Sequence, residues 1–122
     1  MYACTKRYPE ICVAHRNWRS GTHCSLVHGY ARTVELTFEG PLDQNNWVVD
    51  LGNLRFIKDL EKKGAVLLNI MDSSKGYGPS LEQSCLFIAN FVREKLASIG
   101  ATYQLKKVEI WEKGDNRSSL TF

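Results

Sequence analysis

Residues 28–40 read HGYARTVELTFEG and contain the clearest strand of the chain. In the second half of this stretch apolar side chains alternate with polar ones, which is typical of a strand with one buried face. A Gly-Pro pair ends the alternation, so we predict a strand over residues 28–39. Counting back in twos places His28 and Tyr30 on the face of Val34, unless a bulge intervenes.

The sequence after this strand predicts two helices. Asp50 is a good N-cap for a helix over 51–62, where apolar residues recur at helical spacing. A second helix begins at Ser80, because Ser80 and Gln83 form an S-x-x-Q capping box, and Gly100 ends it. The apolar stripe of this second helix comprises Leu81, Cys85, Ile88, Val92 and Leu96.

Three further strands complete the predicted fold. They cover residues 10–17, residues 102–112 and a short segment at 117–122. The order strand, strand, helix, helix, strand, strand fits an α+β fold in which a four-stranded antiparallel sheet carries both helices on one face. At 122 residues the chain is expected to form a single domain, 1–122.

The composition excludes several classes of protein. Hydrophobic residues make up 43% of the chain, too many for a disordered chain, and no apolar run reaches the roughly 18 residues of a membrane span. The first residues lack the apolar stretch of a signal peptide, so we expect a cytoplasmic protein. The net charge of +3 suits an anionic small molecule and falls short of a dedicated nucleic-acid binder.

All three histidines lie within the first 28 residues, and they are candidate metal ligands. His28 and Tyr30 would point the same way, and His15 on the neighbouring strand would meet them across the sheet. Zinc sites use three or four ligands, so Tyr30, Cys24 or His23 would have to join the two well-placed histidines. The simpler alternative is that His15 and His28 pack near the end of the sheet without a metal.

The four cysteines are irregularly spaced and form no CxxC pair, so we expect free thiols and no disulfide framework. Cys24 lies in a polar stretch beside the candidate metal ligands. A nearby cation would lower its pKa and make it a usable base or nucleophile, and the alternative is a free surface thiol. Cys4, Cys12 and Cys85 are expected to be structural.

Glu112 is a carboxylate on an otherwise apolar strand face. It follows Val108 and Ile110 at alternate positions, where a carboxylate needs a partner or costs several kcal/mol in desolvation. A ligand with adjacent N–H donors would satisfy it, such as the amino-pyrimidinone edge of a pterin or guanine. The alternatives are exposure at the strand end or a salt bridge to a nearby lysine, Lys106, Lys107 or Lys113.

Five short motifs follow one another along the chain in a specific order and spacing. They resemble the motifs of the 6-pyruvoyl-tetrahydropterin synthase and 6-carboxy-tetrahydropterin synthase family over almost the whole chain. The motifs are Val13-Ala14-His15-Arg16, Cys24-x-x-x-His28-Gly29, Trp47-Val48-Val49-Asp50, Pro79-Ser80-Leu81-Glu82 and Val108-Glu109-Ile110-Trp111-Glu112.

The resemblance implies a tunnelling fold of two strands, two helices and two strands, which agrees with the predicted order of elements. It implies a lyase that converts dihydroneopterin triphosphate by an elimination or retro-aldol reaction, with zinc polarising the substrate side chain. Members of the family form trimers stacked as hexamers, so the resemblance implies a homo-oligomer with sites at subunit interfaces.

The resemblance also implies a role for individual residues. His15 and His28 match the first two zinc ligands, and Cys24 matches the catalytic cysteine that acts as base. The implied substrate-binding residues are Glu112, which anchors the pterin ring, together with Ser80 and Glu82 at the start of the second helix.

Two departures from the family pattern concern the chemistry. Tyr30 stands where the family has its third zinc histidine. Gly64 and Ala65 stand where the family has an Asp-His pair that assists the cysteine, and no histidine follows His28 to replace it. Asp72 would at most restore a carboxylate.

The sequence therefore leaves more than one function open. The first is a divergent zinc-dependent lyase that breaks a carbon–oxygen or carbon–carbon bond, with zinc on His15, His28 and Tyr30. The second is a catalytically inactive homologue that binds a pterin or purine ring, or an assembly subunit. A third keeps Cys24 as a nucleophile toward another heterocycle. Roles in queuosine-type and biopterin-type biosynthesis look alike in the sequence.

Overall fold

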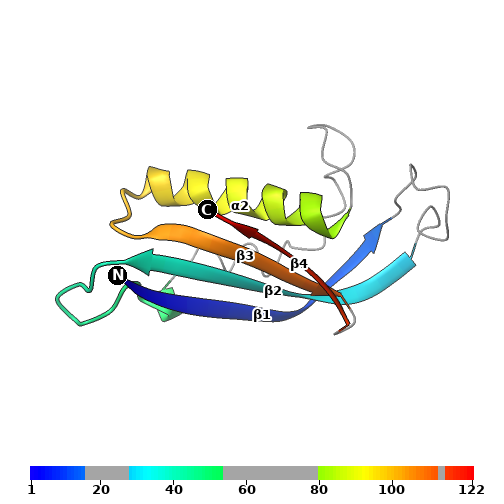
Figure 1. The fold of residues 1–122 in the computed structure, drawn as a ribbon, viewed down its shortest axis with the longest axis horizontal. Coiled ribbons are helices and arrows are strands. Elements are labelled where there is room, and N and C mark those ends of the chain that lie inside the picture. The colour runs from blue at the N-terminus through cyan, green and yellow to red at the C-terminus, as the bar shows by residue number, and fades with distance from the viewer. Residues whose placement is uncertain (16–27, 54–79, 113–114) are drawn as a thin grey trace.

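A computed structural model of the chain describes residues 1–15, 28–53, 80–112 and 115–122. Four strands form one antiparallel sheet in the order β1-β2-β3-β4, and helix α2 lies across one face of it (Figure 1). The element bounds are β1 Tyr2–His15, β2 His28–Gly40, the short 3-10 helix η2 Leu51–Asn53, α2 Leu81–Ser98, β3 Gln104–Glu112 and β4 Asn116–Thr121. The predicted α+β class and four-stranded antiparallel sheet are confirmed.

Strand β1 begins at Tyr2, eight residues before the predicted start of the first strand. The charged pair Lys6-Arg7 hides the alternation in the sequence, but pairing with β2 gives every residue from Tyr2 to Tyr8 a partner. Thr5 Oγ1 lies 2.9 Å from Thr37 Oγ1, and Arg7 opposes Glu35. Cross-strand pairs of this kind stabilise a strand that propensity alone does not reveal.

One extra residue on β1 forms a bulge. Tyr8 pairs with Val34 and Ile11 pairs with Arg32, so three steps along β1 match two steps along β2. Strand β2 keeps its alternation at this point. His28 and Tyr30 therefore occupy the same alternating set of β2 positions as Val34, as the sequence predicts.

Helix α2 has the ends that the sequence predicts. Ser80 is the N-cap, and its hydroxyl accepts the N–H of Gln83 at 3.2 Å. At the other end Gly100 has φ +63°, and the N–H of Ala101 donates to the carbonyl of Leu96 at 3.1 Å. These are the features of a Schellman motif, in which a left-handed glycine satisfies the last helical carbonyls.

The first predicted helix, over 51–62, is only partly described. Its start forms η2, and Oδ1 of Asp50 accepts the N–H of Gly52 at 3.1 Å, which agrees with a capping role for Asp50. Residues 54–62 lie outside the described residues.

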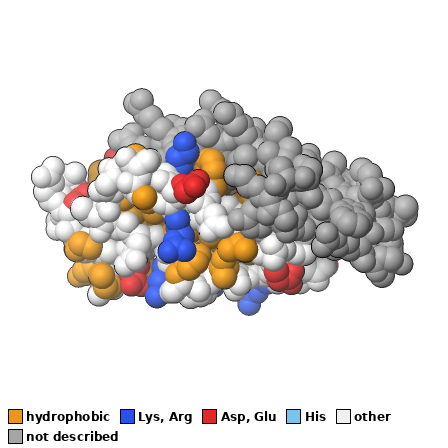
Figure 2. All heavy atoms as spheres, turned by 90° about the horizontal axis from the view of Figure 1, so that it is seen from above, with side chains coloured by type: hydrophobic (Ala, Val, Ile, Leu, Met, Phe, Trp, Pro, Cys, Tyr) orange, Lys and Arg blue, Asp and Glu red, His pale blue; other side chains and the backbone are white. Residues whose placement is uncertain are grey.

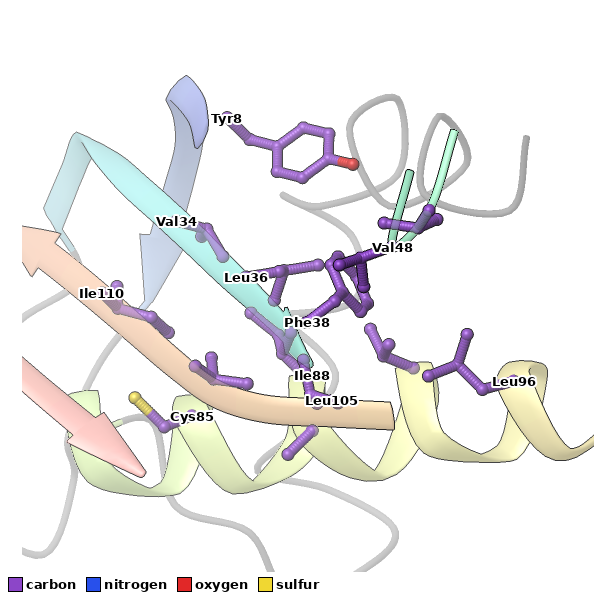
Figure 3. Close-up of a cluster of buried hydrophobic side chains, with 14 residues drawn as sticks. Tyr8, Val34, Leu36, Phe38, Val48, Cys85, Ile88, Leu96, Leu105 and Ile110 are labelled. Atoms are coloured by element: carbon purple, nitrogen blue, oxygen red, sulfur yellow. The ribbon is translucent and has the colours of Figure 1, made fainter. Parts of the chain in front are cut away.

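The core lies between the sheet and α2, where side chains from β2, β3 and the helix point toward one another (Figure 3). Phe38 also makes an edge-to-face contact with Tyr103, with ring centroids 5.7 Å apart. The buried hydrophobic residues are Tyr8, Val34, Leu36, Phe38, Val48, Val49, Cys85, Ile88, Ala89, Val92, Leu96, Leu105, Val108 and Ile110.

The sheet face opposite α2 is polar and charged. Arg7 Nη2 lies 2.7 Å from Glu35 Oε2, and Glu109 contacts both Lys107 at 3.2 Å and Arg117 at 3.6 Å. One face of the sheet is thus apolar and the other solvated, as is common for antiparallel sheets. Of the helices that the structure describes, none is long and apolar enough to cross a membrane.

Candidate functional site

Glu112, the last residue of β3, lies directly opposite Arg32 of β2. Its Oε2 is 3.4 Å from Nη2 of Arg32, and the side chains of Arg32 and Glu112 are 1% and 20% exposed. Arg32 occupies the alternating set of β2 positions that carries Val34 and Leu36 into the core. Glu112 therefore lies beside the buried face of the sheet, as the sequence predicts, and it is paired with the buried cation Arg32.

Arg32 also connects this carboxylate to the first turn of α2. Its Nη1 donates to Oγ of Ser84 at 2.9 Å, and this bond is buried. Oγ of Ser84 in turn donates to the carbonyl of Ser80 at 2.7 Å. A continuous polar chain thus runs from β3 through β2 to the start of the helix.

Glu82, in the same helical turn, is bound by the last strand. Its Oε1 accepts a hydrogen bond from Oγ of Ser118 on β4 at 3.1 Å. The three residues predicted to bind substrate, Ser80, Glu82 and Glu112, are therefore all linked to the junction between the first turn of α2 and the sheet. A carboxylate at a helix start is also favoured by the helix dipole.

The alternative ion pair predicted for Glu112 is present with a different partner. The sequence suggested a lysine, but Lys107 contacts Glu109 instead. Lys113 lies outside the described residues. The partner of Glu112 comes from the neighbouring strand, because the register of β2 and β3 sets Arg32 opposite it. With 20% of its side chain exposed, Glu112 does not extend into bulk water.

The predicted metal ligands occupy matched positions on the β1–β2 hairpin. His15 pairs with His28, and Val13 pairs with Tyr30. In the described residues, β3 pairs with β2 only from Arg32 to Glu39, so this end of the hairpin extends beyond β3 as a two-stranded ribbon (Figure 1). His28 is four residues from Arg32, or roughly 13 Å along the strand.

Cys24, the predicted base, lies outside the described residues, as do Gly64, Ala65 and Asp72. Within the described part of the chain no cluster of three or more His, Cys, Asp or Glu residues could hold a metal ion. A site made of two histidines and a tyrosine would not form such a cluster, so the predicted zinc site stays a prediction.

The two cysteines whose side chains are described behave as structural thiols. Burial raises the pKa of Cys85 to about 11, and the charge of Glu82 adds to this shift. Its Sγ donates to the carbonyl of Ser118 at 3.5 Å. Burial also raises the pKa of Cys4. Both thiols are free and stay protonated at neutral pH, which fits packing rather than nucleophilic chemistry.

Sequence reasoning missed Arg32 and Ser84. Both face the core, and they are the buried polar residues of the described part of the chain. One signal was available: counting in twos along the strand of residues 28–39 puts Arg32 in the same set as Val34, where a charged residue needs a partner. The position of Ser84 beside the helical stripe gave no such signal.

A cavity of about 480 Å³ lies at the other end of β1, lined in part by Tyr2, Cys4, Trp47 and Val49. Tyr2 pairs with Gly40, which is eight residues from Arg32 along β2, or roughly 26 Å. This cavity is therefore separate from the cluster around Glu112. Seen from above, the described surface carries basic and acidic side chains close together, without one extended basic patch (Figure 2).

Comparison with solved structures shows the same fold in proteins with low sequence identity. An uncharacterised protein from Wolinella succinogenes is 17% identical, with a TM-score of 0.74 and coverage of 98% of this chain and 97% of that one. The 6-pyruvoyl tetrahydropterin synthase of Caenorhabditis elegans is 17% identical, with a TM-score of 0.72 and coverage of 100% and 97%. A variant of the Plasmodium vivax 6-pyruvoyltetrahydropterin synthase is 15% identical, with a TM-score of 0.65 and coverage of 98% of both chains.

At these identities the likeness is one of fold, and it confirms the tunnelling fold expected from the sequence. No curated protein sequence matches the chain. The sequence profile described as 6-pyruvoyl tetrahydropterin synthase, however, matches residues 4–121, almost the whole chain. The chain therefore belongs to the 6-pyruvoyl tetrahydropterin synthase family.

Proposed function

We propose that this protein binds the amino-pyrimidinone edge of a pterin, or of a related purine such as guanine, through the carboxylate of Glu112. The observation that carries the proposal is the position of Glu112 at the end of β3, where Arg32 holds one of its oxygens beside the first turn of α2. Ser80 and Glu82 complete the proposed binding site from the helix side.

The recognition chemistry follows from hydrogen-bonding capacity. A carboxylate has about four lone-pair sites, and Arg32 uses one of those on Oε2. Enough sites remain on Glu112 for the ring N–H and the adjacent amino group, which lie side by side on a pterin or guanine. A ring with a carbonyl in place of the amino group would set an acceptor against the carboxylate, so it would bind more weakly.

Ring binding without efficient turnover is the function we favour. Tyr30 replaces the third zinc histidine of the family, and Gly64 and Ala65 replace the Asp-His pair. Loss of a positioned acid–base group costs about 10²–10⁴ in rate. Glu112 itself is unchanged from the family pattern, so recognition of the ring is the part of the family chemistry that the sequence retains.

A second candidate function is a zinc-dependent lyase acting on dihydroneopterin triphosphate. The observation that favours it is the pairing of His15 with His28. Facing residues of an antiparallel pair have Cβ atoms about 5 Å apart, which suits two histidines that share one zinc ion. The phenol of Tyr30 fits less well, because it must ionise to bind zinc and its usual pKa is about 10.

In this second candidate, His15, His28 and Tyr30 would hold the zinc ion, which would supply Lewis-acid polarisation of the substrate side chain. Cys24 would remove a proton from that side chain as the thiolate. Glu112 would orient the ring so that the side chain reaches both groups.

We further propose that the protein is a homo-oligomer, a trimer or a hexamer, as the family resemblance implies. Strands β1 and β4 are the outer strands of the sheet in the described part of the chain, and outer strands offer unpaired backbone groups to a neighbouring subunit. Light scattering would test this, since a mass equal to that of one chain would contradict it.

Calorimetric titration tests the proposed ring binding. We expect saturable binding of neopterin or guanosine by the native protein, and a loss of about tenfold or more in Glu112→Gln. Glutamine keeps an oxygen that can accept from Arg32 but removes the negative charge beside that buried cation, so urea denaturation of the variant must first show that it is folded. Glu109→Gln is the matched control, because Glu109 lies on the same strand and carries ion pairs on the opposite face. Equal affinity in Glu112→Gln and native protein would contradict the proposal.

Metal analysis and product assay distinguish the two candidate functions. The lyase predicts close to one zinc per chain, lost in His28→Ala, and release of triphosphate or acetaldehyde from dihydroneopterin triphosphate. Zinc-free native protein that binds the ring and forms no product would exclude the lyase and leave ring binding.

A further inference from the structure

We propose that Arg32 is a positioning residue for the ring-binding carboxylate: its buried guanidinium fixes Oε2 of Glu112 against the first turn of α2, and so presents Oε1 to the ligand. This inference rests on the proposed ring binding by Glu112. It assigns a role in specificity to a residue that is itself too buried to contact a ligand.

The first argument is geometric. Arg32 contacts two other elements with two different nitrogens: Nη2 lies 3.4 Å from Glu112 on β3, and Nη1 lies 2.9 Å from Ser84 on α2. A guanidinium is planar, and its N–H donors have a fixed geometry. Holding one donor against the helix therefore sets where the other donor meets the carboxylate.

The second argument is burial. With 1% of its side chain exposed, the guanidinium of Arg32 is shielded from solvent. A buried cation is costly without a nearby negative charge, and Glu112 supplies one. The pair is therefore a fixed part of the fold, whereas a solvent-exposed pair would exchange among many side-chain positions.

The third argument compares the two Arg–Glu pairs of the sheet. Arg7 and Glu35 are also cross-strand partners, with Nη2 and Oε2 only 2.7 Å apart, but the side chain of Arg7 is 60% exposed. An exposed pair of this kind contributes little to stability. Arg7 thus offers a matched arginine on the same sheet, on the face away from Glu112.

A carboxylate held in place discriminates between ligands better than a mobile one. A fixed Oε1 accepts hydrogen bonds from a 2-amino-4-oxo ring without first being ordered, and it cannot turn away from the 2-oxo group of a 2,4-dioxo analogue. If Arg32 positions Glu112, removing the guanidinium should reduce the preference for the 2-amino ring more than it reduces the stability of the fold.

The test compares Arg32→Met, Arg32→Lys and the control Arg7→Met. The first measurement is the ratio of Kd values for a 2-amino-4-oxo pterin and its 2,4-dioxo analogue. We expect this ratio to fall about tenfold in Arg32→Met, to recover in part in Arg32→Lys, and to stay native in Arg7→Met. The second measurement needs no ligand: hydrogen exchange of the backbone amides of Gln83 and Ser84, which should be about tenfold faster in Arg32→Met.

The outcomes separate this inference from the proposed function. If native protein binds the pterin and Arg32→Met has the same ratio of Kd values as native protein, the positioning role is overturned and ring binding stands. If native protein binds neither ring, ring binding fails, and with it the role of Arg32 in specificity. Unchanged exchange at Gln83 and Ser84 would then show that Arg32 does not order the helix start either. Should Arg32→Met not fold, Arg32→Lys and Ser84→Ala give the same two measurements.

Discussion

Oγ of Ser118 on β4 lies 3.1 Å from Oε1 of Glu82 in the first turn of α2. The last strand therefore binds the same helical turn that Arg32 reaches from β2 through Ser84. Two separate strands thus hold the start of the helix against the sheet. The proposed ligand-binding residues on this turn are positioned by tertiary contacts as well as by the helix itself.

Replacing Ser80 should show how much its role as the N-cap of α2 contributes to stability. We expect Ser80→Ala to lower the free energy of unfolding by about 1 kcal/mol, because the N–H of Gln83 loses its acceptor. Ser80→Asp should keep the stability, since aspartate is an equally good cap. Urea denaturation measures both. A Ser80→Asp protein that is as unstable as Ser80→Ala would show that the cap is not the source of the effect.

Removing the serine that faces Arg32 should be costly by itself. Ser84→Ala leaves a buried guanidinium donor without its 2.9 Å acceptor, so we expect a loss of about 1–3 kcal/mol in unfolding free energy. The double variant Arg32→Leu/Ser84→Ala should lose less unfolding free energy than the sum of the losses in the two single variants, because donor and acceptor disappear together. Additive losses in a double-mutant cycle would mean that this hydrogen bond contributes nothing.

There is room for a side chain at Gly100, but the backbone conformation there is unfavourable for any residue other than glycine. A Cβ at this position would meet nothing within 4 Å, yet its φ of +63° is unfavourable for an L-residue. We expect Gly100→Ala to cost about 1 kcal/mol and Gly100→Asn to cost less. Thermal unfolding of the two variants checks the order. Equal stability of native and Gly100→Ala protein would show that the left-handed cap is not required.

Stability should fall at high pH in a way that depends on Cys85. Its pKa in the folded chain is about 11, against an ordinary 9.0, so the folded state holds the proton more tightly. The stability that the folded chain gains from this protonated thiol is complete below pH 9.0. As the pH rises toward 11, the free energy of unfolding falls by on the order of 2 kcal/mol.

Chemical denaturation at pH 8 and at pH 10.5 measures this effect, with Cys85→Ala as the reference. The variant is less stable at both pH values because it leaves a cavity, but its stability should change less between them. The raised pKa of Tyr103 contributes equally to both proteins and cancels in the comparison. An identical pH dependence in both would contradict the assignment to Cys85.

Local signals were sufficient for much of the fold. Strand β2 and helix α2 have almost the predicted bounds, because a Gly-Pro pair, a serine cap and a terminal glycine mark their ends in the sequence. The first half of β1 was not predicted, since the charges of Lys6 and Arg7 obscure its alternation. That segment becomes a strand because β2 offers it partners, such as Thr37 for Thr5.

The candidate site was predicted in position and not in its contacts. Glu112 stood out because a carboxylate followed two apolar residues on one strand face. Its partner Arg32 is 80 residues away in sequence, and only the register between β2 and β3 brings them together. Counting in twos puts Arg32 in the same set as Val34, but an arginine is more often solvated than buried, and the sequence does not identify the partner that a buried one would need.

The β1–β2 hairpin has a further consequence beyond the point where β3 ends. The residues predicted to bind zinc lie on the ribbon, whereas the core cluster lies on the other side of the Arg32–Glu112 pair. Substitutions at the tip can therefore accumulate without disturbing the hydrophobic interior. This separation makes the ribbon the place where Tyr30→His could be introduced by design, to test whether a third histidine completes the predicted zinc site.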